Sequence, residues 1–327
     1  MKMTNSSEEI KYSIIVPVYN NANTLERCLK GLMDQDLGNG TCEIIFVNDG
    51  STDHSLQIVN RYPVKVLKSM VKTGAYAARN RGIANSSGNI LLFTDATCYP
   101  CRDWMQNLIL GFTDERIGCV AGQILSAPPR TLVGYFSEDR KTHDMSSNLN
   151  REIPSFACGN VAIKREVFER IGLFDESLES GGDGDFAFRV HLDGKFRVAY
   201  QPNACVYYNH RETLRGLLGQ AFKYGRGIAR FRLNYYGSPN ANKSISLTRN
   251  LVILAIQFGS IIFIPWRILK EYKKTGKLIA AMVYPSIDKL HSIWSQSGIV
   301  AGLIQYAGHK RSPIPKLNSN ARQKITR

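Results

Sequence analysis

Residues 43–53 of the chain read EIIFVNDGSTD, an apolar, β-branched run that stops at a cluster of turn-forming polar residues. Such a run predicts a buried strand that carries Asn48 and Asp49 at its carboxyl end. Two similar runs occur nearby, SIIVPVYNN at residues 13–21 and NILLFTD at residues 89–95. In a parallel sheet the carboxyl ends of strands meet at one edge, where ligands bind. The three strand ends therefore predict a ligand site.

Helical patterns alternate with these strands. Apolar residues at helical spacing follow Thr24, residues 75–84 form a second helical pattern, and a third begins at Trp104. A further short strand is expected at residues 64–67. Strands alternating with helices at this spacing predict an α/β fold with a mixed, mainly parallel sheet and helices on both faces.

The composition changes near residue 236, where the sequence YGSPN begins. We therefore expect two parts: an α/β domain at residues 1–235, and a basic, apolar, helical and membrane-proximal region at residues 236–327. Within the first part, residues 130–152 are rich in Arg, Asp, Ser and Asn, and are expected to form an insertion or loop.

The charge of the chain is concentrated in its last third. Residues 206–327 contain 20 Lys and Arg but only three acidic residues, a net charge of +17, whereas residues 1–205 carry −2. A basic block attracts either nucleic acid or an anionic membrane. The apolar run LVILAIQFGSIIFIPW at residues 251–266, with basic residues on both sides, favours the membrane, because nucleic-acid surfaces interleave basic and aromatic residues instead.

Whether this region crosses the membrane stays open at the level of sequence. A crossing helix needs about 20 mainly apolar residues, and the run at 251–266 is shorter and contains Gln257 and Pro265. A second apolar stretch at residues 293–307 also contains polar residues. One short span, two helices lying in the membrane plane, and buried helices of a soluble domain all fit.

The sequence favours a cytoplasmic location for the α/β domain, at the cell membrane. The first residues, MKMTNSSEEIKYS, lack the pattern of a secretory signal. The seven cysteines are an odd number in a long chain, which indicates reduced thiols. Cys98 and Cys101 have redox-motif spacing, but they directly follow the third polar strand end, so a ligand-binding role for this region is preferred.

Five segments, taken in order, resemble glycosyltransferase family 2, whose members have the GT-A fold. They are IIVPVYN at 14–20, NDGSTD at 48–53, ARNRGI with GNILLFTDA at 78–96, GNVAIKREVFERIGLFDE at 159–176 and GGDGDFAFR at 181–189. The resemblance covers about residues 11–230. It implies an enzyme that transfers a sugar from a nucleotide-diphosphate sugar to a hydroxyl group of an acceptor.

The resemblance assigns the donor nucleotide to Pro17, Tyr19, Asp49 and Asp95. Asp49 would accept hydrogen bonds from the base or the ribose, although an aspartate in such a turn often serves the turn alone. Uracil is the base that the resemblance suggests first, with thymine and guanine nucleotides left open.

Asp95 would also hold a divalent cation, Mn²⁺ or Mg²⁺, which neutralises the departing diphosphate. The usual Asp-x-Asp element is here Asp95-Ala96-Thr97, so the second carboxylate is missing. His210 matches a family position that assists the metal or the diphosphate, or is simply a strand-end histidine. The sequence therefore offers a metal ion one carboxylate at this element, not two.

Asp183 matches the catalytic base of the family, and Gly182 stands where an acidic residue usually precedes it. A base that deprotonates the acceptor hydroxyl implies direct displacement with inversion. Gly159, Asn160 and Asp185 are expected on the acceptor side. The alternatives are that the acidic pair is a solvated turn and that Asn160 is a turn residue.

Residues 220–224, QAFKY, resemble a diluted form of the Gln-x-x-Arg-Trp element of processive polysaccharide synthases. With two apolar stretches at most, the chain is expected to transfer single sugars. Lys223 and Arg226 are candidates for contacts to a diphosphate or a lipid phosphate, or are an ordinary basic helix face.

The leading hypothesis is therefore an inverting glycosyltransferase of cell-envelope polysaccharide biosynthesis. Its partners would be a nucleotide-sugar donor, a lipid-linked or other glycan acceptor and the membrane surface, with no nucleic acid. A non-catalytic relative that binds nucleotide or saccharide is the alternative, motivated by Thr97. A nucleotidyltransferase would need a glycine-rich phosphate loop after the first strand, and VPVYNNANTLERC has none.

Overall fold

The computed structural model describes residues 10–35, 41–141, 155–235 and 246–308. They form an eight-stranded sheet in the order β3-β2-β1-β4-β7-β6-β8-β5. The strands are β1 (Ile10–Val18), β2 (Thr41–Asp49), β3 (Lys65–Ser69), β4 (Ile90–Thr94), β5 (Cys98–Pro100), β6 (Ile117–Ser126), β7 (Asn160–Lys164) and β8 (Arg197–Tyr208).

The sheet is mixed. Strands β3, β2, β1 and β4 run parallel to one another, and β6 runs parallel to β8. Strand β7 is antiparallel to both β4 and β6, and β5 is antiparallel to β8. The carboxyl ends of β1, β2 and β4 consequently lie at one edge, as the sequence predicts.

Helices cover both faces of the sheet, because alternate strand residues point to opposite sides. Ile14 and Val16 pack with one set of helices, whereas Ile15 packs with the other. The first set comprises α1 (Ala22–Met33), α2 (Ser55–Val59) and α4 (Trp104–Leu110), and the second comprises α3 (Ala75–Ala84), α7 (Arg165–Ile171) and α8 (Gly182–Asp193). The predicted fold class is confirmed.

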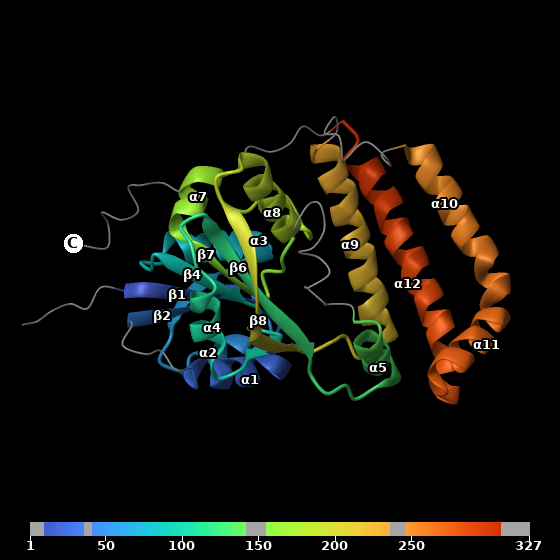
Figure 1. Ribbon diagram of the computed structural model, residues 1–327, viewed down its shortest axis with the longest axis horizontal. Coiled ribbons are helices and arrows are strands. Elements are labelled where there is room, and N and C mark those ends of the chain that lie inside the picture. Colours follow the sequence, from blue (N-terminus) through green and yellow to red (C-terminus); the bar gives the residue numbers. More distant parts are fainter. Residues whose placement is uncertain (1–9, 36–40, 142–154, 236–245, 309–327) are drawn as a thin grey trace, which may run out of the picture.

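A layer of long helices lies beside this α/β body (Figure 1). It consists of α9 (Leu214–Asn234), α10 (Leu247–Gly259), the short 3-10 helix η2 (Ser260–Phe263), α11 (Ile264–Thr275) and α12 (Leu278–Gln305). Helix α9 precedes the predicted domain boundary at residue 235 but packs along α12. The boundary itself stays a prediction.

One short helix was not foreseen. Residues 132–139, inside the segment expected to be a loop, form α5 (Leu132–Asp139). The Thr131 side chain caps this helix by accepting a hydrogen bond from the Gly134 amide, and Phe136 packs against Tyr284 of α12. The expectation of a loop is wrong for these residues, since capping and long-range packing stabilise a helix too short to show a clear period. Residues 142–152 of this segment lie outside the described part.

Helix α12 packs closely on α9 through glycines. A Cβ atom at Gly298 would clash with the backbone of Phe222, and one at Gly225 would clash with the backbone of Ser295. The second apolar stretch noted in the sequence, residues 293–307, lies largely within α12, and its Ile293, Ile299 and Leu303 are buried.

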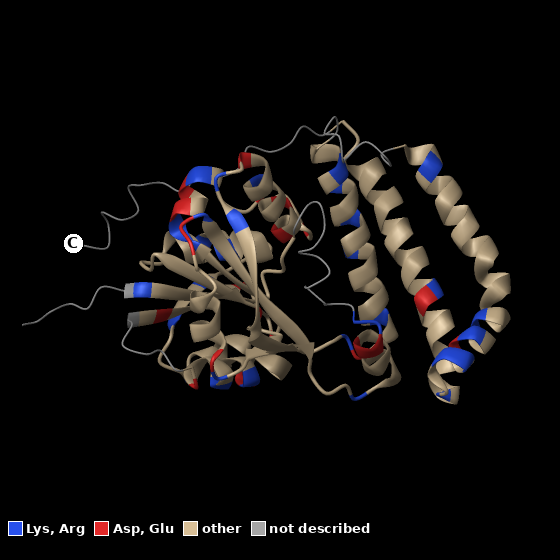
Figure 2. Cartoon of the chain, viewed as in Figure 1, with Lys and Arg blue, Asp and Glu red and all other residues tan. Residues whose placement is uncertain are grey.

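The outermost helices carry the first apolar run. Leu247–Thr275 forms a continuous helical stretch of 29 residues that is long and apolar enough to cross a membrane, and none of its most apolar window is buried in the protein. Figure 2 shows that α10 has almost no charged side chains, whereas Lys and Arg gather along α9 and on α11. An exposed apolar surface of this size is typical of a site that contacts a protein or a membrane.

Candidate active site

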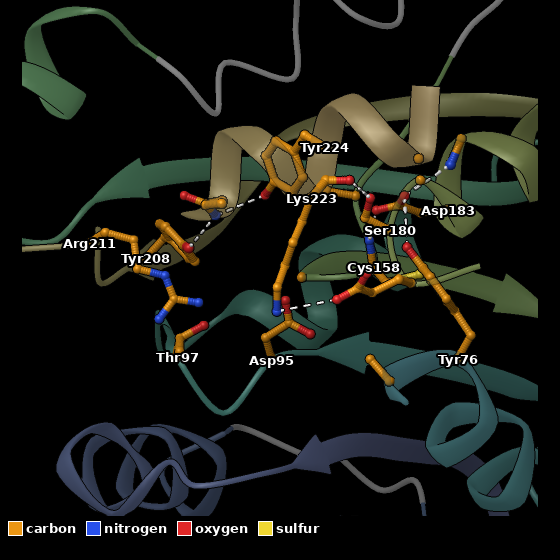
Figure 3. A pocket seen from close by; sticks show the side chains of 18 of the residues that line it. Tyr76, Asp95, Thr97, Cys158, Ser180, Asp183, Tyr208, Arg211, Lys223 and Tyr224 are labelled. Carbon is orange, nitrogen blue, oxygen red and sulfur yellow. Dashed lines mark hydrogen bonds and ion pairs between the residues drawn. The ribbon is translucent and has the colours of Figure 1, made fainter. Parts of the chain in front are cut away.

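A cavity of about 1470 Å³ lies between the carboxyl edge of the sheet and helix α9. The end of β4 contributes Asp95 and Thr97, and the start of α8 contributes Asp183 (Figure 3). Helix α9 forms the opposite wall with residues that include Lys223 and Tyr224. Two of the four aspartates singled out in the sequence, Asp95 and Asp183, are thus brought together in one cavity.

Asp95 is held by a buried arginine. The Arg79 guanidinium, on α3, donates to the Asp95 carboxylate at 2.5 Å, and Arg79 is only 5% exposed. Gly159 lies against the same carboxylate, because a Cβ atom there would come 3.3 Å from Asp95 Oδ2. The absence of a side chain at Gly159 leaves the carboxylate open to the cavity, which Gly159 also lines.

Asp183 stands in the first turn of α8. The Tyr76 hydroxyl donates to Asp183 Oδ1 at 3.3 Å, and the Cys158 amide donates to Oδ2 at 3.4 Å. Burial raises the pKa of Asp183, against the lowering effects of Arg79 and of the backbone amides. A buried carboxylate of raised pKa at the wall of a cavity is suited to accept a proton.

The glycines before Asp183 have a structural reason. Gly181 has a φ of 79°, in the left-handed region that favours glycine. A Cβ atom at Gly182 would lie 2.8 Å from the Tyr76 ring, so the acidic residue expected here would displace that tyrosine.

The residues expected around the donor base lie outside the cavity lining. Tyr19 is 38% exposed, and the Lys72 ammonium sits 4.2 Å from the centre of its ring. Pro17 is half-buried near the end of β1. The Asp49 carboxylate accepts hydrogen bonds from the Thr73 amide, the Thr73 hydroxyl and the Gly74 amide at 2.6–2.8 Å. Asp49 thereby holds the turn that leads into α3.

Two residues expected on the acceptor side point into the protein core instead. Asp185 is fully buried, pairs with Arg189 at 2.9 Å and accepts from the Tyr235 hydroxyl at 2.7 Å. Asn160 is 1% exposed and bonds to the Trp104 ring and to backbone carbonyls of β6 and β8. Neither lines the cavity, and both hold elements of the fold together.

His210 is not among the residues that line the cavity. Its ring bonds to the Ser126 hydroxyl at 2.7 Å, and burial lowers its pKa. Within the described residues, no three His, Cys, Asp or Glu side chains form a group that could hold a metal ion. With Asp95 paired to Arg79 and Thr97 offering only a hydroxyl, these residues do not fit a metal site of their own.

Comparison with known proteins identifies the family. Residues 13–172 match the model of glycosyl transferase family 2. This region is a family 2 glycosyltransferase domain. The first three segments that suggested the resemblance, and most of the fourth, lie inside the matched region. The expected class of enzyme, a glycosyltransferase, is confirmed.

Two relatives align with about two thirds of this chain. Glycosyltransferase AglE of Haloferax volcanii is 28% identical over 226 residues, which are 66% of this chain and 72% of AglE. The pre-mycofactocin glycosyltransferase of Mycobacterium tuberculosis is also 28% identical over 66% of this chain, but the match spans only 46% of that protein.

Solved structures extend the likeness into the helical layer. The mannosyltransferase PcManGT of Pyrobaculum calidifontis, in complex with GDP-Man and Mn²⁺, has a TM-score of 0.59 at 19% identity, covering 92% of this chain and 87% of its own. S. aureus TarS 1–349 in complex with UDP-GlcNAc has a TM-score of 0.51 at 17% identity, covering 92% and 93%. At these identities the likeness concerns the fold, which is that of GT-A glycosyltransferases.

Sequence reasoning missed three residues that this family 2 chain directs at the cavity. Tyr76 and Arg79 lie on α3, and Arg79 is part of the quoted ARNRGI segment, so a signal was present. Arg211 directly follows His210, which drew attention instead. Its position beside Thr97 depends on the pairing of β8 with β5, the strand that follows Thr97, which sequence spacing does not reveal.

Proposed function

We propose that the protein transfers a sugar, with inversion, from a nucleotide-diphosphate sugar to a hydroxyl of a membrane-borne glycan or lipid-linked acceptor. The observation that carries the proposal is that Asp95 and Asp183, from separate elements, face one large cavity in a family 2 chain. Uridine nucleotides are the first donors to test, followed by guanosine nucleotides, since the two solved neighbours carry UDP-GlcNAc and GDP-Man.

The chemical step we propose is a single displacement. Asp183 takes the proton of the acceptor hydroxyl while that oxygen attacks the anomeric carbon. The bond between this carbon and the diphosphate oxygen breaks, and the electron pair leaves with the nucleoside diphosphate. Attack opposite the leaving group inverts the anomeric centre. Cys158 and Tyr76, which bond to Asp183, would orient its carboxylate for this proton transfer.

The nucleotide is proposed to lie along the carboxyl ends of β1, β2 and β4. Pro17, Tyr19 and Asp49 would face the base and ribose, with Lys72 stacked on the Tyr19 ring. Mn²⁺ accompanies the donor in a solved neighbour. Here Asp95 is the carboxylate available to such an ion, His210 is turned to Ser126, and the described residues do not complete a site, so we assign the metal no step.

Membrane association is proposed from the helical layer. The apolar stretch Leu247–Thr275 is exposed, and Lys270, Lys273 and Lys274 follow its apolar part. A basic end beside an apolar helix is the combination that binds an anionic bilayer surface. All seven cysteines are free thiols, in keeping with a domain on the cytoplasmic side. The acceptor would then belong to cell-envelope polysaccharide synthesis.

A donor screen tests the proposal. The protein would be incubated with UDP-, GDP- and dTDP-sugars, and both thermal stabilisation and release of nucleoside diphosphate would be measured. A donor should raise the melting temperature, because it binds the folded state. Slow hydrolysis of the same donor would indicate transfer to water. Binding without turnover, even with membrane extracts as acceptor, would instead support the non-catalytic alternative that Thr97 suggests.

A further inference from the structure

The site differs in charge from one built on two aspartates. In the usual Asp-x-Asp element two carboxylates face the donor diphosphate, and a metal cation must separate these negative groups. Here Thr97 is neutral, and the single carboxylate of Asp95 is already paired with Arg79. The diphosphate end of the cavity therefore lacks the negative charge that makes a metal necessary.

Arg211 lies where the missing carboxylate would act. Residue 209 is fixed to Thr97, since both the Asn209 amide and its side-chain nitrogen donate to the Thr97 carbonyl at 3.1 and 2.8 Å. Figure 3 shows the Arg211 guanidinium beside Thr97, and both residues line the cavity. The positive charge of Arg211 also lowers the pKa of Tyr208, the residue at the end of β8, although burial outweighs this effect.

The guanidinium of Arg211 is available to a ligand. None of the described residues forms an ion pair with it. The adjacent acid, Glu212, is turned away, because it accepts from the Thr131 hydroxyl at 2.7 Å. Gly216 packs against the aliphatic part of Arg211. A Cβ atom added at Gly216 would lie 3.6 Å from the Cβ and Cδ atoms of that arginine. The Arg211 side chain is thus held in place by packing, while its positive charge is not neutralised by an acidic side chain among the described residues.

A second cation approaches from the opposite wall. Lys223 extends from α9 across the cavity toward Asp95 in Figure 3, and its ammonium pairs with Glu179 at 3.5 Å. Lys223 and Arg211 thus face the Asp95–Thr97 segment from different elements. Fixed guanidinium and ammonium groups stabilise a departing diphosphate in the same way as a metal ion, by placing positive charge where negative charge develops.

We propose that Arg211 takes over the charge-neutralising role of a divalent cation at the donor diphosphate, with Lys223 assisting. The inference rests on the proposed function, and it identifies Arg211 as the residue that stabilises the departing nucleoside diphosphate. Binding and transfer should consequently depend on Arg211 more than on added metal. Asp95 remains in contact with the donor, but as one member of a site whose net charge is positive.

Calorimetric binding of UDP, GDP and dTDP, each compared with its monophosphate, tests this on the full chain with EDTA or with MnCl₂. The wild type should bind one diphosphate about as tightly in EDTA as in Mn²⁺. Arg211→Gln should weaken diphosphate binding roughly 10- to 100-fold, the range for one lost charged hydrogen-bonding group, and monophosphate binding little. Lys30→Gln, on an exposed side chain of α1, is the control for net charge.

Thr97→Asp provides the reverse test, since it restores the second carboxylate. This variant should bind the diphosphate poorly in EDTA and regain affinity with Mn²⁺. A wild type that binds the diphosphate only with Mn²⁺, or an Arg211→Gln protein that binds it normally in EDTA, would overturn the inference alone. If the wild type binds none of the three diphosphates under either condition, the proposed function itself fails.

Discussion

Asp183 and Asp185 are two residues apart, and the structure gives them opposite surroundings. Asp183 faces the cavity, whereas Asp185 is fully buried between Arg189 and Tyr235. Successive helix positions are rotated by about 100°, so residues two apart point in nearly opposite directions. Asp183→Asn should therefore lower transfer about 10²- to 10⁴-fold in a product-formation assay, while donor binding is retained. An Asp183→Asn protein with normal turnover would remove this residue as the base.

The acidity of Asp183 gives a second measurement. Burial raises its pKa, so a larger fraction of Asp183 is protonated at mildly acidic pH than for a solvated aspartate. A base must be ionised to act, and we expect kcat/KM to fall with decreasing pH through this raised pKa. Because the folded pKa is above the unfolded one, ionisation of Asp183 also lowers stability as pH rises. Asp183→Asn should accordingly melt no lower than the wild type at neutral pH.

Asp185 should show the reverse behaviour. Asp185→Ala leaves the buried Arg189 guanidinium without its carboxylate and the Tyr235 hydroxyl without this acceptor. Removing one partner of a buried ion pair typically costs about 3–5 kcal/mol of unfolding free energy. Urea unfolding should reveal this loss, whereas kcat of the folded fraction should change little. A large loss of kcat at unchanged stability would return Asp185 to the acceptor side, as its sequence neighbourhood first suggested.

At the scale of elements, the spacing of apolar residues along the sequence predicted most of the strands and helices of the α/β body. Residues 75–84 form α3 as expected, and the three polar strand ends lie at one edge. What the period could not supply is orientation. Asn160 begins β7 in an antiparallel pair with β4, and its side chain turns to Trp104 rather than to the cavity. Which face a residue presents depends on partner elements distant in sequence.

The packing of α12 on α9 depends on glycines, which the sequence did not single out. Gly298→Ala would place a methyl group against the Phe222 backbone, and overpacking of this kind costs about 1–3 kcal/mol despite the better helix propensity of alanine. Gly219→Ala is the matched control in α9, because a Cβ atom there meets nothing within 4 Å. Thermal unfolding should show a lower melting temperature for the first variant and an equal or higher one for the second.

At the scale of the whole molecule, the basic residues and the apolar surface lie in different places. The sequence showed where each lies along the chain, but not where each lies in space. Among the basic residues of the last third, one group lies on α9, which lines the cavity with Lys223, and another lies on α11, at the outer side of the helical layer. One block of positive charge in the sequence thus serves two surfaces. Only the three-dimensional arrangement separates a basic group that faces the cavity from one on the outer side of the helical layer.

The outer surface leads to a prediction about vesicle binding. Lys270, Lys273 and Lys274 on α11 should attract anionic lipid, and each basic residue near such a surface contributes about 1 kcal/mol. Replacing all three by Gln should weaken binding to phosphatidylserine vesicles roughly 100-fold in a sedimentation assay. Lys11, Lys30 and Lys195, which are exposed on the α/β body, form the matched triple control. Equal binding by both triple variants would contradict a docking role for α11.

The mode of attachment can be separated from its strength. If α10 and α11 lie in the membrane plane, alkaline carbonate should extract the protein from membranes, and raised salt should weaken its binding, because surface attraction is screened. If Leu247–Thr275 spans the bilayer, carbonate should leave the protein in the membrane fraction. Ile262→Asp places a charge on an apolar side chain that is 76% exposed on this stretch. It should reduce membrane recovery in either arrangement, and unchanged recovery would show that this face does not meet lipid.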